Sequence, residues 1–222
     1  MIIAVQPKQK RRAVFVALLA IILGALIGTN FPFPGNIDEA VRAFMTTIQT
    51  PYGDIMMAIS TFLGSPAMDI IYVIILAVIL LLADLKIPAI WTISTMLLGQ
   101  GLMRIIKILV NRDRPVGHLL TDSGSSFPSQ HTFGAFVVIF IMFLLVMPNI
   151  SSAVTRILAK WAIITIGFMV MLSRLYLSAH FLSDVIAGLL FAYAWVILAA
   201  ACYPKMANYL KNNFRMFQHE EI

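Results

Sequence analysis

The chain has 222 residues, of which 60% are hydrophobic and 12% are charged, and its formal net charge is +6 at pH 7. A soluble domain is roughly 45–50% apolar, so a chain of this length could not bury so much apolar surface in water. The composition excludes an ordinary soluble protein and predicts one membrane-embedded domain over residues 1–222. The single cysteine, Cys202, rules out an intrachain disulfide and a cysteine-based metal site, and its apolar surroundings predict a core position.

Six apolar runs are long enough to cross a bilayer, which needs about 20 residues in a helix. The sequence therefore predicts an all-α, polytopic membrane protein with six transmembrane helices and both termini on one side. The predicted spans are 13–31, 66–83, 87–110, 131–147, 153–176 and 181–203.

Ten of the sixteen basic residues lie beside span ends on the side of the termini: Lys8, Lys10, Arg11, Arg12, Lys86, Arg156, Lys160, Lys205, Lys211 and Arg215. Under the positive-inside rule this side is cytoplasmic. We therefore expect a multi-pass protein of the cell membrane with both termini in the cytoplasm. The opposite span ends then face outward. Because these charges mark topology, the positive net charge does not predict a nucleic-acid partner.

Residues 36–62, between the first two spans, are too polar to cross the membrane. Asn36 followed by Glu39 resembles a capping box and predicts a helix start. Apolar residues then recur at helical spacing on both sides of Pro51: Ile37, Val41, Phe44, Met45 and Ile48, then Ile55, Ala58, Ile59 and Phe62. The pattern predicts one or two amphipathic helices in the interface, with packing against the bundle as the equal alternative.

The remaining basic residues gather elsewhere, and five of the six lie at the outer ends of the third and fifth spans. They are Arg42, Arg104, Lys107, Arg112, Arg114 and Arg174. His131 and His180 fall at the outer starts of the fourth and sixth spans. Ionisable groups beside a membrane are costly, so this clustering predicts a functional site on the outer face.

Taken singly, each grouping has an ordinary structural explanation. Lys107 and Arg114 could be snorkelling anchors, Ser129 could be a helix cap, and His180 with Asp184 could be a helical side-chain pair. Together they suit phosphoryl transfer, because cations can hold phosphate oxygens and the start of the fourth span is a natural anion site. Two histidines would supply a nucleophile and a proton carrier.

Three motifs carry a resemblance to the type 2 phosphatidic acid phosphatase superfamily. Lys107 to Pro115 matches its Lys, six residues, Arg-Pro motif, and Ser173 to Asp184 matches its Ser-Arg, five residues, His, three residues, Asp motif. Pro128 to His131 matches Pro-Ser-Gly-His except at Gln130, which replaces glycine. A helix-start conformation also allows glutamine at this position, so we expect function to survive the replacement, while pocket shape and substrate choice are not predicted.

The resemblance implies a role for each motif residue. His180 would attack phosphorus and form a phosphohistidine, Asp184 would orient it, and His131 would act as general acid and then as base. Phosphate would be held by Lys107, Arg114, Ser129, Arg174 and the backbone N–H of Gln130. No cofactor and no metal is implied. Arg112 and Asp113 are not motif positions and receive no role.

Four residues of the outer loop and the tail are predicted to stay outside the chemistry. His118 is expected to be solvated, and His219 needs no role. Asp122 and Ser126 are expected at the rim of the pocket.

The implied activity is hydrolysis of a lipid phosphate in the outer leaflet, and the candidates are undecaprenyl diphosphate, phosphatidylglycerol phosphate and phosphatidic acid. A lipid phosphotransferase would carry the same motifs. An anion transporter is the alternative of another class, although transporters often bind near the midplane and these charges gather at one end. The sequence does not predict an oligomeric state.

Overall fold

The computed structural model describes residues 3–117, 123–218 and 220, and within these residues the regular elements are all helices. They are α1 (Pro7–Gly28), α2 (Pro32–Thr47), α3 (Pro51–Leu63), α4 (Pro66–Leu82), α5 (Lys86–Val110), α6 (Gln130–Leu145), η1 (Met147–Asn149), α7 (Ala153–Tyr176), α8 (Leu182–Asn213) and η2 (Arg215–Phe217).

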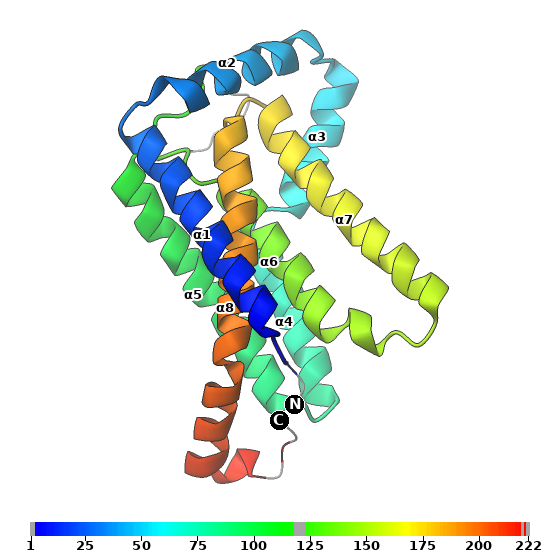
Figure 1. Cartoon of the computed structure of the whole chain (residues 1–222). Helices are drawn as coiled ribbons and strands as arrows, with labels where there is room; N and C mark the ends of the chain where they lie inside the picture. The colour runs from blue at the N-terminus through cyan, green and yellow to red at the C-terminus, as the bar shows by residue number, and fades with distance from the viewer. Residues whose placement is uncertain (1–2, 118–122, 219, 221–222) are drawn as a thin grey trace.

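The long helices run side by side, and α2 lies across one end of the bundle (Figure 1). Among the described residues, five helices are long and apolar enough to cross a membrane, and α3 with α4 qualifies as a sixth span only as a pair bent by 48°. The prediction of an all-α, multi-pass membrane protein is confirmed. The second predicted span corresponds to α4, whose 17 residues are long enough to form a span only together with α3.

Proline and hydroxyl residues set the helix starts. Proline occupies the first turn of α1 to α4, where its missing N–H leaves no hydrogen bond unmade. Thr50 caps α3 and Ser65 caps α4, each accepting a backbone N–H with its side-chain oxygen. The predicted start at Asn36 is wrong, because α2 begins four residues earlier at Pro32.

The helices between the first two spans turn much of their apolar surface outward. Ile37, Phe44 and Ile48 of α2 are exposed, as are Ile55 and Phe62 of α3. The buried residues of α2 are instead Pro34 and Asp38. This arrangement favours interfacial helices whose apolar face is open to a bilayer over helices that bury that face in the bundle.

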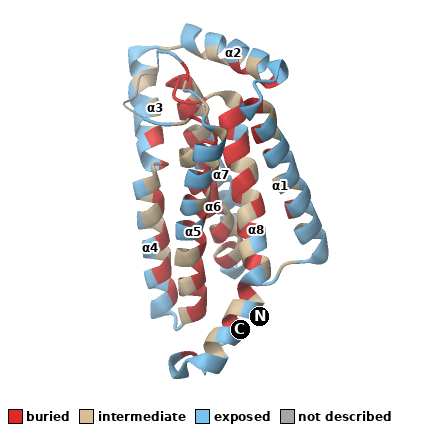
Figure 2. Ribbon diagram, turned by 90° about the vertical axis from the view of Figure 1, so that its left-hand side faces the viewer, coloured by how far each residue is buried: buried red, intermediate tan, exposed pale blue. Residues whose placement is uncertain are grey.

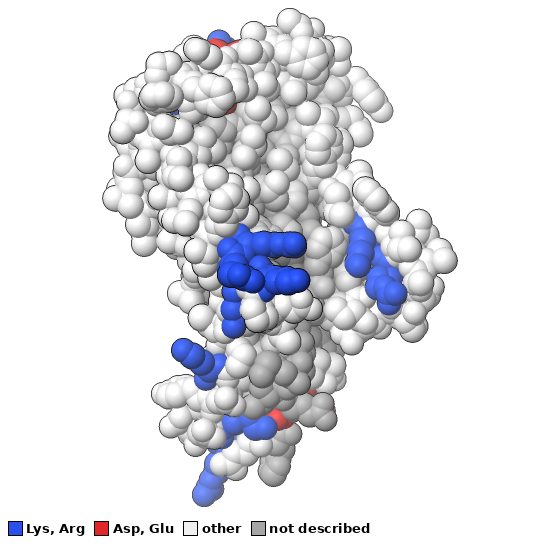
Figure 3. All heavy atoms as spheres, viewed as in Figure 1, with Lys and Arg blue, Asp and Glu red and all other residues white. Residues whose placement is uncertain are grey.

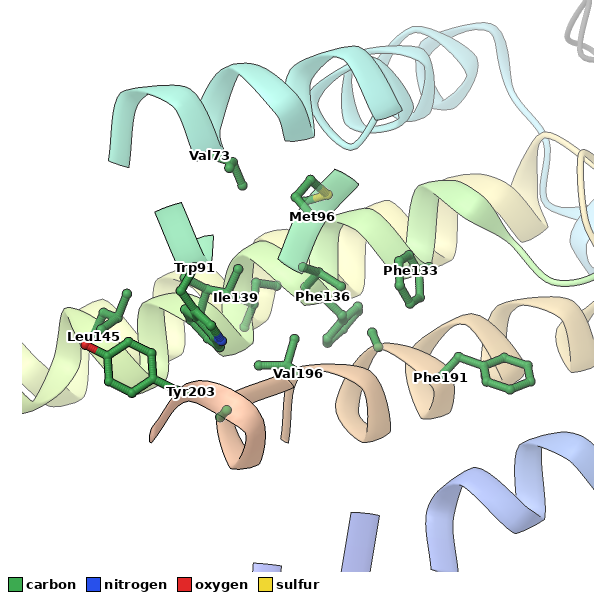
Figure 4. Close-up of a cluster of buried hydrophobic side chains, with 14 of the residues drawn as sticks. Val73, Trp91, Met96, Phe133, Phe136, Ile139, Leu145, Phe191, Val196 and Tyr203 are labelled. Carbon is green, nitrogen blue, oxygen red and sulfur yellow. The ribbon is translucent and has the colours of Figure 1, made fainter. Parts of the chain in front are cut away.

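The core lies along α5, α6 and α8, each of which carries more buried residues than any other helix (Figure 2). In Figure 4 the aromatic rings of Phe133, Phe136 and Tyr203 occupy the space between these helices. The indole N–H of Trp91 donates to the carbonyl of Ala199 at 3.1 Å, which ties α5 to α8. The helices that carry the candidate site are therefore the most firmly packed ones.

The end of the chain differs from expectation. The sixth span was predicted to stop at Tyr203, yet α8 continues through Pro204 to Asn213. Ala207 within the continuation is buried, and beyond the helix Glu220 forms an ion pair with Lys86 at 3.3 Å, so this end of the chain remains in contact with the bundle. The predicted core position of Cys202 is also wrong, since its side chain is exposed on the outer surface of α8.

Basic residues mark the end of the bundle that holds both chain termini. Figure 3 shows Lys and Arg gathered over the lower part of the molecule, below the level of α2. These charges belong to the starts of α1, α5 and α7 and to the end of α8 and η2. The opposite end, where α5 and α7 finish and α6 and α8 begin, carries the candidate site.

Candidate active site

A pocket of about 590 Å³ opens at this opposite end of the bundle. Five of the predicted site residues line it together, from α5, the segment after it, α6 and the turn before α8. They are Lys107, Arg114, Gln130, His131 and His180. Arg104, one turn before Lys107 on α5, also lines the pocket. The helix starts and ends thus bring side chains far apart in the sequence into one basic pocket.

A tight turn after α7 sets the position of His180. The backbone N–H groups of Ala179 and His180 both donate to the carbonyl of Arg174, and Ser178 adopts a left-handed conformation with φ of 51°. The imidazole is almost fully buried, with Nε2 3.4 Å from Nη1 of Arg114 and Nδ1 3.5 Å from Oδ2 of Asp184. One ring nitrogen therefore faces the pocket and the other faces a carboxylate.

The protonation state of His180 follows from its surroundings. Burial lowers its pKa from 6.5 to about 4, and the positive charges of Arg174 and Arg114 act in the same direction. Asp184 opposes this effect without overcoming it. The ring is neutral at neutral pH, which is the form with a lone pair for nucleophilic attack. The 3.5 Å separation from Asp184 exceeds a well-formed hydrogen bond, as is common in catalytic groups without substrate.

Arg114 and Lys107 are fixed by carbonyl groups of the loop around the pocket. Arg114 donates from Nε to Gly124 at 3.0 Å and from Nη1 to Ala179 at 2.9 Å. Lys107 donates from Nζ to the carbonyl of Ser125 at 2.6 Å. Both cations are held in place at the wall, so they are preorganised to receive an anion.

The start of α6 forms another wall of the pocket. Ser129 is the N-cap of this helix, fully buried, and it accepts the backbone N–H of Thr132 at 3.4 Å. Gln130 and His131 then occupy the first turn, where backbone N–H groups have no partner within the helix. The side chain of Gln130 donates to Oε1 of Gln100 on α5 at 2.6 Å, so its amide is engaged with a neighbouring helix.

Close packing of α8 on α6 supports this helix start. The backbone N–H of Ser129 donates to the carbonyl of Asp184 at 3.0 Å. A Cβ added to Gly188 would come within 2.6 Å of the carbonyl oxygen of Ser129. A glycine is needed there because a side chain would push the two helices apart.

Three of the predicted site residues lie behind the pocket wall. Ser129, Arg174 and Asp184 are each fully buried and do not line the pocket. Arg174 donates from Nη1 to the hydroxyl of Thr61 on α3. Its charge nevertheless acts on the imidazole of His180. These three residues therefore contact the residues that line the pocket and do not reach the pocket themselves.

Two residues that sequence reasoning left out are connected to the carboxylate of Asp184, which Arg112 binds directly and Asp38 reaches through Arg112. Arg112 donates from Nη1 to Oδ1 of Asp184 and from Nη2 to Oδ2 of Asp38, each at 2.6 Å. Arg112 is not a position of the three motifs. Asp38 lies within residues 36–62, where the sequence predicts only interfacial helices. A sequence signal existed only for Arg112, which is one of the basic residues gathered at the outer span ends.

The remaining loop predictions have different outcomes. Ser126 is fully buried and its hydroxyl donates to the carbonyl of Asp113 at 2.9 Å, so it supports the loop and does not form the rim of the pocket. His118, Asp122 and His219 lie outside the described residues. Among the residues that are described, no three His, Cys, Asp or Glu side chains group closely enough to hold a metal ion.

Comparison with known proteins agrees with this geometry. The family model of the PAP2 superfamily matches residues 88–207. Phosphatidylglycerophosphatase B of Bacillus subtilis (strain 168) is 30% identical over 185 residues, which cover 80% of this chain and 87% of that protein. The crystal structure of the first transmembrane PAP2 type phosphatidylglycerolphosphate phosphatase from Bacillus subtilis has the same fold, with a TM-score of 0.67, 24% identity and coverage of 91% of this chain and 98% of that one. The chain belongs to the PAP2 superfamily and is a PAP2-type membrane lipid phosphatase.

Proposed function

We propose that the protein hydrolyses the phosphomonoester of phosphatidylglycerol phosphate at the outer face of the membrane, through a phosphohistidine at His180 and without a metal. The observation that carries this proposal is the orientation of His180. Its Nε2 faces the basic pocket beside Arg114 and its Nδ1 faces Asp184. His131, on α6, lines the same pocket.

The reaction would proceed in two displacements. In the first, the lone pair on Nε2 of His180 forms a bond to phosphorus while the bond to the lipid oxygen breaks, and His131 gives that oxygen a proton. In the second, His131 takes a proton from water, whose oxygen attacks phosphorus and releases phosphate from His180. Asp184 would accept a hydrogen bond from Nδ1 and stabilise the positive ring of the intermediate.

The donors around the pocket would hold the phosphate oxygens. Lys107 and Arg114 supply positive charge, and the first turn of α6 supplies the N–H of Gln130 near the positive end of the helix. Ser129 would act by capping this helix, and Arg174 would add charge behind His180. No step requires a metal, because cationic side chains take the part that metal ions play at other phosphoryl-transfer sites.

The choice of substrate rests on one of the relatives. This chain is 30% identical to phosphatidylglycerophosphatase B of Bacillus subtilis, and the name of that protein favours phosphatidylglycerol phosphate over undecaprenyl diphosphate and phosphatidic acid. A phosphotransferase would use the same phosphohistidine, and an anion transporter would bind the headgroup without breaking a bond.

The test is release of inorganic phosphate by purified protein in mixed micelles that contain each of the three lipids in turn. We expect the fastest release from phosphatidylglycerol phosphate, no loss of rate in chelator, and inhibition by vanadate, which resembles the five-coordinate transition state. Release that needs a second lipid as acceptor would favour the phosphotransferase. Absence of release from every lipid would contradict the proposal.

The sidedness has a separate test. Lys and Arg near both termini favour a cytoplasmic position for that end, which would place the pocket outside. Val116, next to the pocket loop, has a side chain 87% exposed. A Val116→Cys, Cys202→Ser protein should react with an impermeant thiol reagent in intact cells. Labelling only after permeabilisation would place the pocket inside.

A further inference from the structure

Arg112 joins three helices through its guanidinium group, beside the pocket but outside its lining. The residue follows the end of α5, and its side chain is 14% exposed. Nη1 donates to Oγ of Ser183 at 2.7 Å and to Oδ1 of Asp184 at 2.6 Å, and Nη2 donates to Oδ2 of Asp38 at 2.6 Å. The guanidinium carbon lies 4.1 Å from the centre of the Phe181 ring.

Asp38 brings α2 into the same network. Its side chain is only 2% exposed, and Oδ1 accepts the backbone N–H of Ser183 at 2.9 Å. Oδ2 accepts the hydroxyl of Ser183 at 2.6 Å in addition to the guanidinium of Arg112. The carboxylate thus holds the first turn of α8, the turn that directly follows His180.

The network fixes the orientation of Asp184. Its Oδ1 is held by Arg112, and its Oδ2 accepts the backbone N–H of Phe181 at 2.9 Å. Oδ2 is also the oxygen that faces Nδ1 of His180. With both oxygens fixed, the carboxylate can present Oδ2 to the imidazole in only one direction, which selects the tautomer with a lone pair on Nε2.

The charges of the network also suit the reaction. One guanidinium lies between two carboxylates, so the group keeps a net negative charge next to a ring that becomes positive when it carries a phosphoryl group. Removing Arg112 would leave two buried carboxylates close together without compensation. Removing the charge of Asp38 would leave the positive charge of Arg112 to neutralise the carboxylate of Asp184 alone. Asp184 would then stabilise the positively charged ring of His180 less well.

We propose that Arg112 and Asp38 are positioning residues for the nucleophile, and that they act through Asp184. Asp38 thereby makes the interfacial helix α2 part of the catalytic framework. This inference rests on the proposed function, because it assigns the two residues to the step in which His180 attacks phosphorus.

The experiment is a double-mutant cycle on lipid phosphate hydrolysis. Arg112→Gln, Arg112→Lys and Asp38→Asn are each measured in the wild-type protein and in an Asp184→Asn background. In the wild-type background we expect kcat to fall about 10–100-fold for Arg112→Gln, the usual cost of losing an outer partner of a site residue, with KM almost unchanged. Arg112→Lys should recover only part of the rate, since an ammonium cannot hold two carboxylates as a planar fork does.

The Asp184→Asn background distinguishes positioning from general support. If both residues act through Asp184, their substitution should lower kcat little further once that carboxylate is gone. The matched control is Glu39→Gln, the neighbour of Asp38 on α2, which is exposed and pairs only with Arg42 in the described structure. It should leave kcat and KM as in the wild type.

Several outcomes would overturn the inference. Equal fractional losses in both backgrounds would show that the residues act independently of Asp184, and a raised KM would place them in substrate binding. Unchanged rates would remove them from the mechanism. Should Asp38→Asn fail to fold, the two Arg112 variants decide the matter alone. The proposed function fails separately, if the wild-type protein itself releases no phosphate.

Discussion

The two ends of the helical bundle both carry basic residues, but they hold them in different ways. At the end where α6 and α8 begin, Arg112 is partly buried between two carboxylates and Arg114 is fixed by loop carbonyls. At the end with the chain termini, Lys10 and Arg11 are exposed on α1 and Lys160 is exposed on α7. Arginines that are hydrogen-bonded to fixed partners hold the neighbouring side chains in one arrangement. Exposed lysines and arginines have no such constraint and instead bias the orientation of the helices in a membrane. The difference distinguishes basic residues of the candidate active site from basic residues that would set the orientation of the protein in the membrane.

The largest contrast concerns the nucleophile. His180→Ala should reduce phosphate release to the level without enzyme, and Asp184→Asn should leave a measurable residue because the nucleophile remains but its orientation is lost. Lys10→Gln, at the other end, should change neither kcat nor KM. Initial rates in mixed micelles decide this. Wild-type turnover by His180→Ala would remove the assignment.

A second contrast uses the one motif position that departs from the family. Gln130 is the first residue of α6, where a helix tolerates proline, which here removes the backbone N–H and the side-chain hydrogen bond to Gln100. Gln130→Pro should therefore cost about 10²–10³-fold in kcat, the usual effect of removing one preorganised donor, together with about 1 kcal/mol of stability from the lost hydrogen bond to Gln100.

The companion variant keeps the donor and removes the side chain. Gln130→Gly should retain most of the activity and lose about 1 kcal/mol of stability with the hydrogen bond to Gln100. A loss of turnover in Gln130→Gly as large as that in Gln130→Pro would show that the amide side chain contacts the substrate.

The packing of α6 on α8 can be tested with two glycines. Gly188→Ala would place a methyl group within 2.6 Å of the Ser129 carbonyl, and we expect it to lower stability by about 1–3 kcal/mol. Gly101→Ala on α5 meets nothing within 4 Å and should be neutral or slightly stabilising. Thermal unfolding in one detergent compares the two. Equal midpoints would contradict a close helix contact at the site.

Sequence reasoning succeeded where a residue's neighbours are set by a helix end. Lys107, His131 and His180 could be brought together because each lies at the same end of a span, so the span count alone places them on one face. Asp38 could not be predicted in this way. Its contact with Ser183 joins residues 145 positions apart, and the amphipathic pattern of α2 would assign an aspartate to water. The helix instead turns that aspartate toward the start of α8 and leaves apolar residues such as Ile37 and Phe44 exposed.

The last expected effect concerns stability and follows from protonation of His180. Its pKa of about 4 in the folded protein lies below the ordinary 6.5, so the unfolded state binds more protons between these values and stability is lost as pH falls through this range. From pH 7 to pH 5 the loss from this residue amounts to about 2 kcal/mol at most. Thermal midpoints at the two pH values should differ less in His180→Gln than in the wild type. An equal difference would show that His180 does not titrate as described.

The most direct measurement of the central claim is detection of the phosphoryl group on His180. With a substrate whose leaving group needs no proton, the His131→Ala protein should form the intermediate and break it down slowly, since the base for the second step is missing. After a quench in alkaline denaturant, labelled phosphate should be found on the peptide that contains His180, and it should be released by acid. Turnover without any protein-bound label, or label on another residue, would contradict the account.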